Sequence, residues 1–284
     1  MPSVKLITNA AQRRDPTRTS SLRHAYANEF KRRWGAVKRE VQAKLIQDDA
    51  LGLRGGGFLS PAQRTSSFST WLNLTITRQV SRDWQHTFLR NGYRRGVAQA
   101  DADLEAAYRK AKQTYAGIDQ ASIFQQTIHA GEIALTEAKY DSDLENIQSA
   151  VIAQASRKAT EALSQGWTPE DTYTAVADRV DKIGNTRSRV LALTAIIDAF
   201  ALGSLNRLSQ VGIQRVSIIP EVIFTTAGDG QVCEFCREEA GRVYNIFEAK
   251  GVIPLHGGCR CRWTLDLGFL LAQLGLIDVL DGNR

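Results

Sequence analysis

The sequence is poor in proline and methionine and has no long uninterrupted hydrophobic run. Its 284 residues include 6 Pro and 22 Gly, and 43% are hydrophobic, which excludes the collagen-like and disordered classes. The longest apolar stretch, Leu267 to Leu280, contains Gly, Gln and Asp and is shorter than the roughly 20 residues of a membrane-spanning helix. We therefore expect a globular chain with no membrane-spanning segment, in which this stretch is a buried helix or a partner-binding end.

The sequence also lacks a secretory signal and the common catalytic motifs. Its first fifteen residues contain no apolar core, which predicts synthesis and residence in a reducing cytoplasm. It has no H-E-x-x-H, no G-x-S-x-G and no phosphate-binding G-x-x-x-x-G-K-[ST], and the H-x-E that precedes P-C-x-x-C in zinc deaminases is missing. We expect a protein that is not an enzyme.

Charge is distributed unevenly along the chain. The net charge is +6, but residues 1–120 hold 21 Lys and Arg against 10 Asp and Glu, whereas residues 121–284 hold 15 against 20. This asymmetry predicts a basic helical arm over 1–120 and a mildly acidic domain over 121–284. Such an arm suits contact with the phosphates of double-stranded DNA or with an acidic protein surface, unless the basic residues only solvate one side of long helices.

Most of the chain has the periodicity or composition of helices. Two N-terminal series of apolar residues recur every three or four positions and predict two long helices separated by a glycine-rich loop over 52–61. Further helices are expected over 99–115, 119–164, about 169–183 from an N-cap at Thr168, and 190–208, the last ended by Gly212 as C-cap. The first series is Tyr26, Phe30, Trp34, Val37, Val41 and Leu45, and the second is Leu72, Ile76, Val80, Trp84 and Phe88.

The residue composition changes from helix-forming to strand-forming after Gly212. Residues 216–226 are β-branched and aromatic and predict a strand, with residues 263–265 as a possible partner strand. The predicted fold class is therefore mostly α. Long N-terminal helices precede a C-terminal α+β module with a small sheet and a zinc-knuckle-like Cys/His cluster at 225–263.

The four cysteines of the chain lie within 29 residues near its C-terminal end. Cys233 and Cys236 form a C-x-x-C pair, whose sulfurs can both turn toward one ion. His256, Cys259 and Cys261 follow and make five candidate ligands for a four-coordinate metal. We expect a structural zinc, and the alternatives are reduced cysteines without a metal, a disulfide or a catalytic thiol paired with His256.

The same segment resembles the C-terminal signature of the phage Mu F-like family of minor head proteins, also called head morphogenesis proteins. The pattern is T-x-x-D-x-x-V-C-x-x-C followed, after about twenty residues, by P-x-H-x-x-C-R-C. The residues that carry it are Thr226, Asp229, Cys233, Cys236, Pro254, His256, Cys259, Arg260 and Cys261. The helical lead-in from Gly166 is similar too, so the resemblance extends over about 150–267.

The resemblance implies a structural virion protein of a tailed bacteriophage. It would associate with the portal protein and the major capsid protein inside the head, and would act in head morphogenesis or in DNA packaging or delivery, after assembly in the host cytoplasm. Two other functions remain open: a zinc-stabilised DNA-binding protein, and a nuclease or transferase that uses Asp229 and His256.

Overall fold

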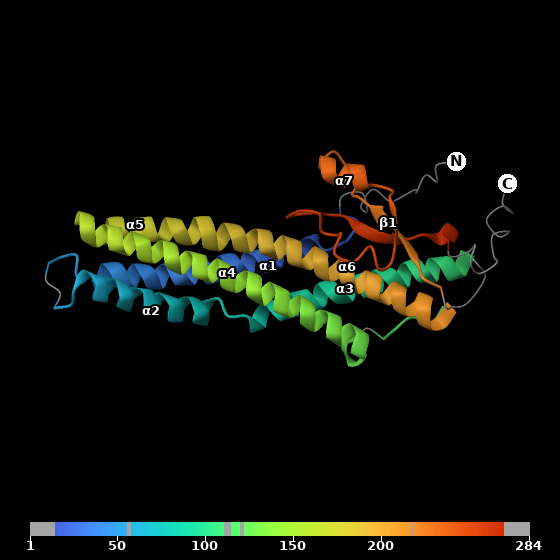
Figure 1. The fold of residues 1–284 in the computed structure, drawn as a ribbon, viewed down its shortest axis with the longest axis horizontal. Coiled ribbons are helices and arrows are strands. Elements are labelled where there is room, and N and C mark those ends of the chain that lie inside the picture. Colours follow the sequence, from blue (N-terminus) through green and yellow to red (C-terminus); the bar gives the residue numbers. More distant parts are fainter. Residues whose placement is uncertain (1–14, 56–57, 111–114, 120–121, 217, 270–284) are drawn as a thin grey trace. The chain divides into compact units, whose positions relative to one another are not determined.

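The computed structural model describes residues 15–55, 58–110, 115–119, 122–216 and 218–269. Figure 1 labels its helices and strand β1. The helices are α1 (Ser20–Gln42), α2 (Pro61–Gln79), α3 (Asp83–Lys110), α4 (Thr127–Gln165), α5 (Pro169–Arg179), α6 (Thr186–Val216) and the short α7 (Glu234–Glu239). The strands β1 (Glu221–Thr225), β2 (Val243–Asn245) and β3 (Arg262–Leu265) form an antiparallel sheet in the order β2-β1-β3. The predicted fold class, mostly helical with a small C-terminal sheet and a Cys/His cluster, is confirmed.

The chain divides into two compact units. The helical unit comprises His24–His86 and Ala138–Ala192, and the sheet unit comprises the chain up to Arg23, Thr87–Glu137 and the chain from Leu193 onward. Each unit thus combines segments from both sides of residue 120, where the charge distribution predicts a boundary.

The first apolar series lies in the core of the helical unit. All six of its residues are buried, and the last, Leu45, belongs to a π-helical turn that extends α1. The indole nitrogen of Trp34 donates a hydrogen bond to Ser188 Oγ at 3.0 Å. Gly184 lies against the same indole, where a Cβ atom would come within 2.8 Å of the ring. A residue without a side chain is therefore needed at this contact.

The second apolar series does not form one helix, so the prediction of a single helix through Phe88 was wrong. Helix α2 ends at Gln79, Val80 leaves helical geometry at φ −116° and ψ 46°, and α3 begins at Asp83. Four residues turn an α-helix by about 400°, so a series spaced by four moves about 40° around the helix at each step. A straight helix therefore cannot keep such a series on one face. The break allows Trp84 to pack edge-on against Phe30, with ring centroids 4.8 Å apart.

The helix start at Thr168 is confirmed, but the predicted end at Gly212 was wrong. Thr168 Oγ1 accepts a hydrogen bond from the Asp171 backbone at 3.1 Å, and Pro169 occupies the first helical turn. A π-helical turn, Val180–Asn185, joins α5 directly to α6, which continues to Val216. Gly212 instead permits close packing, because a Cβ atom there would lie 2.2 Å from Pro220 Cγ.

Among the described residues, one helical stretch, Pro169–Ile213, has the length and apolar composition of a membrane-crossing helix. Within this stretch, 67% of an apolar 18-residue window is buried inside the protein. Burial of this kind is typical of a core helix, which passes the same test of length and composition.

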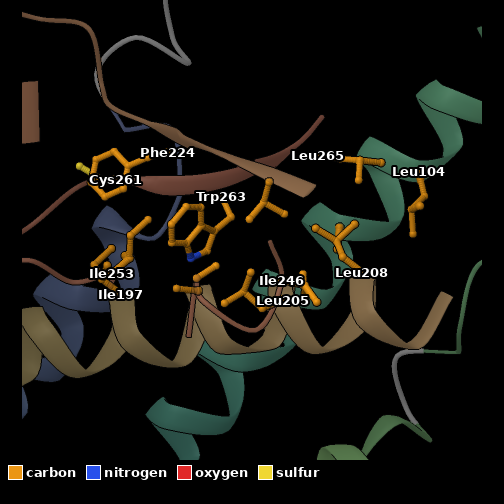
Figure 2. Close-up of a cluster of buried hydrophobic side chains, with 14 of the residues drawn as sticks. Leu104, Ile197, Leu205, Leu208, Phe224, Ile246, Ile253, Cys261, Trp263 and Leu265 are labelled. Atoms are coloured by element: carbon orange, nitrogen blue, oxygen red, sulfur yellow. The ribbon is translucent and has the colours of Figure 1, made fainter. Parts of the chain in front are cut away.

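In the sheet unit, α3 and α6 approach closely and the sheet packs on them. Gly96 makes this approach possible, because a Cβ atom there would lie 2.0 Å from the Phe200 carbonyl oxygen. Figure 2 shows the inner face of the sheet directed at α6 and α3. The labelled side chains from the sheet are Phe224, Trp263 and Leu265, and those from the helices are Leu104, Ile197, Leu205 and Leu208. This core holds β1 and β3 against α3 and α6. The loops that carry the cysteines and His256 extend from one end of these two strands.

Candidate metal centre

The first half of the Cys/His cluster follows strand β1. The chain turns at Gly228, which has a φ of +65°, and Asp229 Oδ1 accepts a hydrogen bond from the Gln231 backbone at 3.0 Å. Cys233 is the N-cap of α7, and its sulfur accepts a hydrogen bond from the Cys236 backbone at 3.4 Å. This knuckle turns both sulfurs of the C-x-x-C pair to the same side.

The second half of the cluster precedes strand β3. The Cys259 backbone donates a hydrogen bond to the His256 carbonyl oxygen at 3.1 Å, which closes a tight turn between the two side chains. Cys261 directly precedes Arg262, the first residue of β3, which pairs with Thr225 at the end of β1. Because β1 and β3 are neighbours, both halves of the cluster meet at the same end of the sheet.

All five residues predicted as ligands come together there. His256 Nε2 lies 3.1 Å from Cys233 Sγ and 3.2 Å from Cys236 Sγ, and Cys236 Sγ lies 3.9 Å from Cys259 Sγ. Two triads have their ligand atoms within 4.8 Å of one another: Cys233, Cys236 and His256, and Cys236, Cys259 and Cys261. Cys236 belongs to both triads. A cavity of about 30 Å³ lies against the cluster.

These spacings fit a tetrahedral zinc site. Zinc–sulfur bonds of about 2.3 Å and zinc–nitrogen bonds of about 2.0 Å place ligand atoms roughly 3.5–3.8 Å apart. The two distances from His256 Nε2 to sulfur, 3.1 and 3.2 Å, are somewhat shorter than this, the Cys236–Cys259 distance of 3.9 Å is slightly longer, and every pair within each triad lies within 4.8 Å. The buried cluster could therefore hold a metal ion such as zinc. That Cys233, Cys236, His256, Cys259 and Cys261 actually bind one stays a prediction.

The tautomer of His256 suits metal binding through Nε2. Its Nδ1 lies 3.0 Å from the Gly257 carbonyl oxygen, which can only accept a hydrogen bond, so Nδ1 carries the proton. Nε2 then presents its lone pair to the sulfurs of Cys233 and Cys236. Metal-binding histidines commonly have this arrangement, in which the outer nitrogen donates to a carbonyl group.

The buried sulfurs differ sharply in acidity. A hydrogen bond from the Cys261 thiol, together with backbone hydrogen bonds from Cys261 and Leu255, lowers the pKa of Cys259 to about 5 despite its burial. The hydrogen bond with Cys259, together with burial, raises the pKa of Cys261. Burial, and then the negative charge of Cys259, raises the pKa of Cys236 to about 12. The shared hydrogen bonds thus favour the thiolate form at Cys259 over Cys236 and Cys261, and a bound cation would displace protons from the thiols that carry them.

Asp229 and Arg260 form an ion pair beside the cluster. Two Arg260 nitrogens donate to the two carboxylate oxygens of Asp229 at 2.8 and 2.7 Å. These hydrogen bonds lower the pKa of Asp229. Both residues belong to the sequence motif. The motif therefore contains the candidate ligands and also this ion pair, which links the two halves of the cluster and is called the brace below.

Two other histidines, His86 and His129, have structural surroundings, and the second belongs to a polar network that the sequence did not reveal. His86 lies 3.0 Å from Asp141 Oδ1 in the helical unit. In the sheet unit, His129 is fully buried, with Nδ1 2.8 Å from the Tyr93 hydroxyl and Nε2 3.3 Å from Gln210. The residues of this network are far apart in sequence, so no local sequence pattern predicts it.

Comparisons with protein-family models, with curated proteins and with solved structures find no match to this chain. The resemblance to Mu F-like proteins therefore rests on the nine motif residues and their placement.

Proposed function

We propose that the Cys/His cluster is a structural zinc centre. Structural zinc sites are closed and four-coordinate, whereas catalytic sites keep a position open for water or substrate. Here the donors outnumber the four positions, three of the sulfurs are buried, and the cavity of about 30 Å³ leaves little room for a substrate. The ion would join the loop after β1 to the loop before β3, and so stabilise a module with a small core.

We further propose that the protein is a minor head protein of a tailed bacteriophage, associated with the portal protein and the inner face of the capsid. It would act in head morphogenesis or in DNA packaging or delivery. The observation that carries this proposal is the convergence of the motif: its residues come from two separate loops and form one Cys/His centre with an Arg260–Asp229 brace. An accidental match of sequence letters would not be expected to build a common site.

The ion pairs of the first 120 residues support a role of their basic side chains within the chain over contact with DNA. Several of these basic side chains are paired with acidic residues later in the chain. Lys38 lies 2.6 Å from Asp181, Arg82 lies 2.7 Å from Glu145, and Arg90 lies 2.6 Å from Glu137. Cations engaged in this way have less charge to offer to phosphates. We propose that the excess positive charge serves mainly helix packing and solvation.

An enzymatic role for Asp229 and His256 has less support. The Asp229 carboxylate accepts both hydrogen bonds of Arg260, and this interaction lowers its pKa away from that of a general base at neutral pH. His256 directs Nε2 at two sulfurs, and the cavity that it lines holds only about 30 Å³. We therefore propose no catalytic residue.

Localisation in phage particles tests the functional proposal directly. Particles would be purified with and without packaged DNA, and the protein located by electron microscopy. We expect it in both, inside the head and next to the portal. Absence from purified particles, or presence only when DNA is packaged, would contradict the proposal and favour the DNA-binding alternative.

A further inference from the structure

The sheet unit contains a buried arginine whose charge is only partly paired. Arg23, near the start of α1, is 6% exposed, and its guanidinium lies 3.5 Å from the Asp15 carboxylate. The Nε of Arg23 is buried and has no hydrogen-bond partner among the residues that the structure describes. A buried cation is costly unless its charge and its donors are satisfied. Arg23 therefore has capacity for a further negative partner.

Asp15 does not serve Arg23 alone. Its Oδ2 accepts a hydrogen bond from the Ser20 backbone at 2.6 Å, and its Oδ1 accepts one from the Thr17 hydroxyl at 2.6 Å. The carboxylate thus closes the turn that precedes α1, and both of its oxygens are already engaged. Arg23 shares this anion with the turn.

The charges of the Cys/His loops act on Arg23. Burial lowers the pKa of Arg23, and Asp15 raises it. The positive charge of Arg260 lowers this pKa further, and the negative charge of Cys259 raises it. Asp229 and then Asp15 raise the pKa of Arg260 in turn. Because such effects fall off with distance, the start of α1 lies near the loop that carries the second half of the cluster.

A loaded centre would carry excess negative charge whichever four donors bind. The candidates are four cysteines and His256, so any four of them include at least three thiolates, and the two positive charges of zinc leave at least one negative charge unbalanced. Asp229 already pairs with Arg260 through two hydrogen bonds, and Asp103 faces Arg262 at 3.5 Å. A buried charge without a counter-charge is strongly destabilising, so the centre requires a further cation nearby.

We propose that Arg23 is the counter-cation of the zinc centre and that its attraction to the loaded centre ties the turn before α1 to the Cys/His loops. The proposal rests on the structural zinc centre proposed above. Arg23 is a positioning residue: it binds no metal, and it favours the loaded state by balancing its charge. Groups that act on a metal from outside its ligands commonly change metal affinity by about 10- to 100-fold.

Zinc affinity in full-length variants tests this role. Arg23→Gln removes the charge, and Arg23→Lys retains it. Arg33→Gln is the control, because Arg33 pairs with Glu29 further along α1, in the helical unit. In competition with a chelator, Arg23→Gln should bind zinc about tenfold more weakly than the wild type, whereas Arg23→Lys should recover most of the affinity and Arg33→Gln should match the wild type. Equal affinity of Arg23→Gln and the wild type would overturn the proposal.

Cobalt in place of zinc reports the charge beside the sulfurs directly. The sulfur-to-cobalt charge-transfer transition moves negative charge away from sulfur, so a cation near the thiolates raises its energy. The band should shift to longer wavelength in Arg23→Gln and return in Arg23→Lys, which loss of a packing contact alone would not produce. An unchanged band in Arg23→Gln would overturn the role of Arg23, whereas a wild type that binds neither zinc nor cobalt would refute the zinc centre itself.

Hydrogen exchange in the wild type supplies a measurement that needs no variant. The full chain is compared with zinc bound and after removal of the metal. Zinc should slow amide exchange in residues 17–23 by about tenfold, because the loaded centre holds Arg23, and should leave exchange in α2 of the helical unit unchanged. Equal exchange of residues 17–23 in the loaded and metal-free protein would overturn the proposal.

Discussion

Arg260 holds Asp229 through two parallel hydrogen bonds, at 2.8 and 2.7 Å, across the two loops that supply the Cys/His centre. A bidentate pair of this kind fixes orientation as well as distance. Asp229 also anchors the turn that leads to Cys233, so the pair sets the position of the first two candidate ligands relative to the others.

Replacement of Asp229 by Asn should therefore loosen the centre. We expect Asp229→Asn to retain the fold but to release zinc to a chelator several times faster than the wild type, as followed with a colorimetric zinc indicator. Glu239→Gln is the matched control, because Glu239 pairs with Arg242 in the same module and contacts no candidate ligand. Similar release from both variants would show that the brace has no role at the centre.

The two overlapping triads predict which substitutions matter most. Cys236→Ser should abolish stoichiometric zinc, because Cys236 belongs to both triads. Cys233→Ser and Cys261→Ser each disturb only one triad, and five donors compete for four positions, so we expect one of these two variants to keep the metal. Elemental analysis gives the stoichiometry, and cobalt substitution reports tetrahedral coordination. Purified wild-type protein without metal, and without loss of stability on chelation, would refute the zinc proposal.

The close approach of α3 and α6 makes a stability prediction. Gly96→Ala would place a methyl group 2.0 Å from the Phe200 carbonyl oxygen, and we expect a loss of about 1–3 kcal/mol in the free energy of unfolding. Gly131→Ala is the control, since Gly131 lies in α4 and a methyl group there would meet no neighbouring group within 4 Å. At that position the helix propensity of Ala should stabilise by up to about 1 kcal/mol. Urea denaturation measures both changes, and equal effects would contradict the packing.

Buried His129 predicts a loss of stability in mild acid. Burial lowers its pKa below the ordinary 6.5, although the hydrogen bond with Gln210 opposes this. The unfolded chain then binds a proton that the folded chain does not, so stability is complete above pH 6.5 and declines as the pH falls below it, by at most about 1.4 kcal/mol per pH unit.

Asn206 donates to the Tyr93 hydroxyl at 2.9 Å, which directs the Tyr93 proton to His129 Nδ1 and leaves no place for a second proton there. His129→Asn should therefore flatten the stability profile between pH 7.5 and 5.5, as measured by urea denaturation. An unchanged slope in His129→Asn would contradict the assignment.

The ion pairs of the basic segment predict weak binding to free DNA. We expect a dissociation constant no tighter than about 10⁻⁵ M for duplex DNA at physiological salt, within the range of nonspecific binding. Fluorescence anisotropy measures it. Tighter binding with a steep salt dependence would favour the DNA-binding alternative.

The sequence anticipated those features that depend on neighbours along the chain. The face from Tyr26 to Leu45, the N-cap at Thr168 and the Cys/His cluster each follow from local spacing or residue type. The continuation past Gly212 depends on tertiary packing against Pro220, which periodicity does not register. The contact of Trp84 with Phe30 likewise joins residues far apart in sequence. Strand β2 has only three residues and is held by pairing with β1, so it carries little signal of its own.

The grouping of the five candidate ligands follows from the sequence more directly than the helix boundaries do, because all five lie in two short motifs. That they bind a metal stays a prediction. The sequence left open how five donors share one centre. The answer depends on the antiparallel pairing of β1 with β3, which brings the loops together in such a way that Cys236 lies between the other donors.

Cys236, Cys259 and Cys261 are themselves members of the hydrophobic cluster that contains Trp263 and Ile253. The same side chains thus serve as core and as candidate ligands, so capture of an ion and consolidation of the core would be a single event. If the centre binds zinc as proposed, the C-terminal module would become rigid only in chains that have taken up the ion. A chain without the ion would keep a less consolidated core, and the concentration of free zinc would then set the fraction of rigid chains.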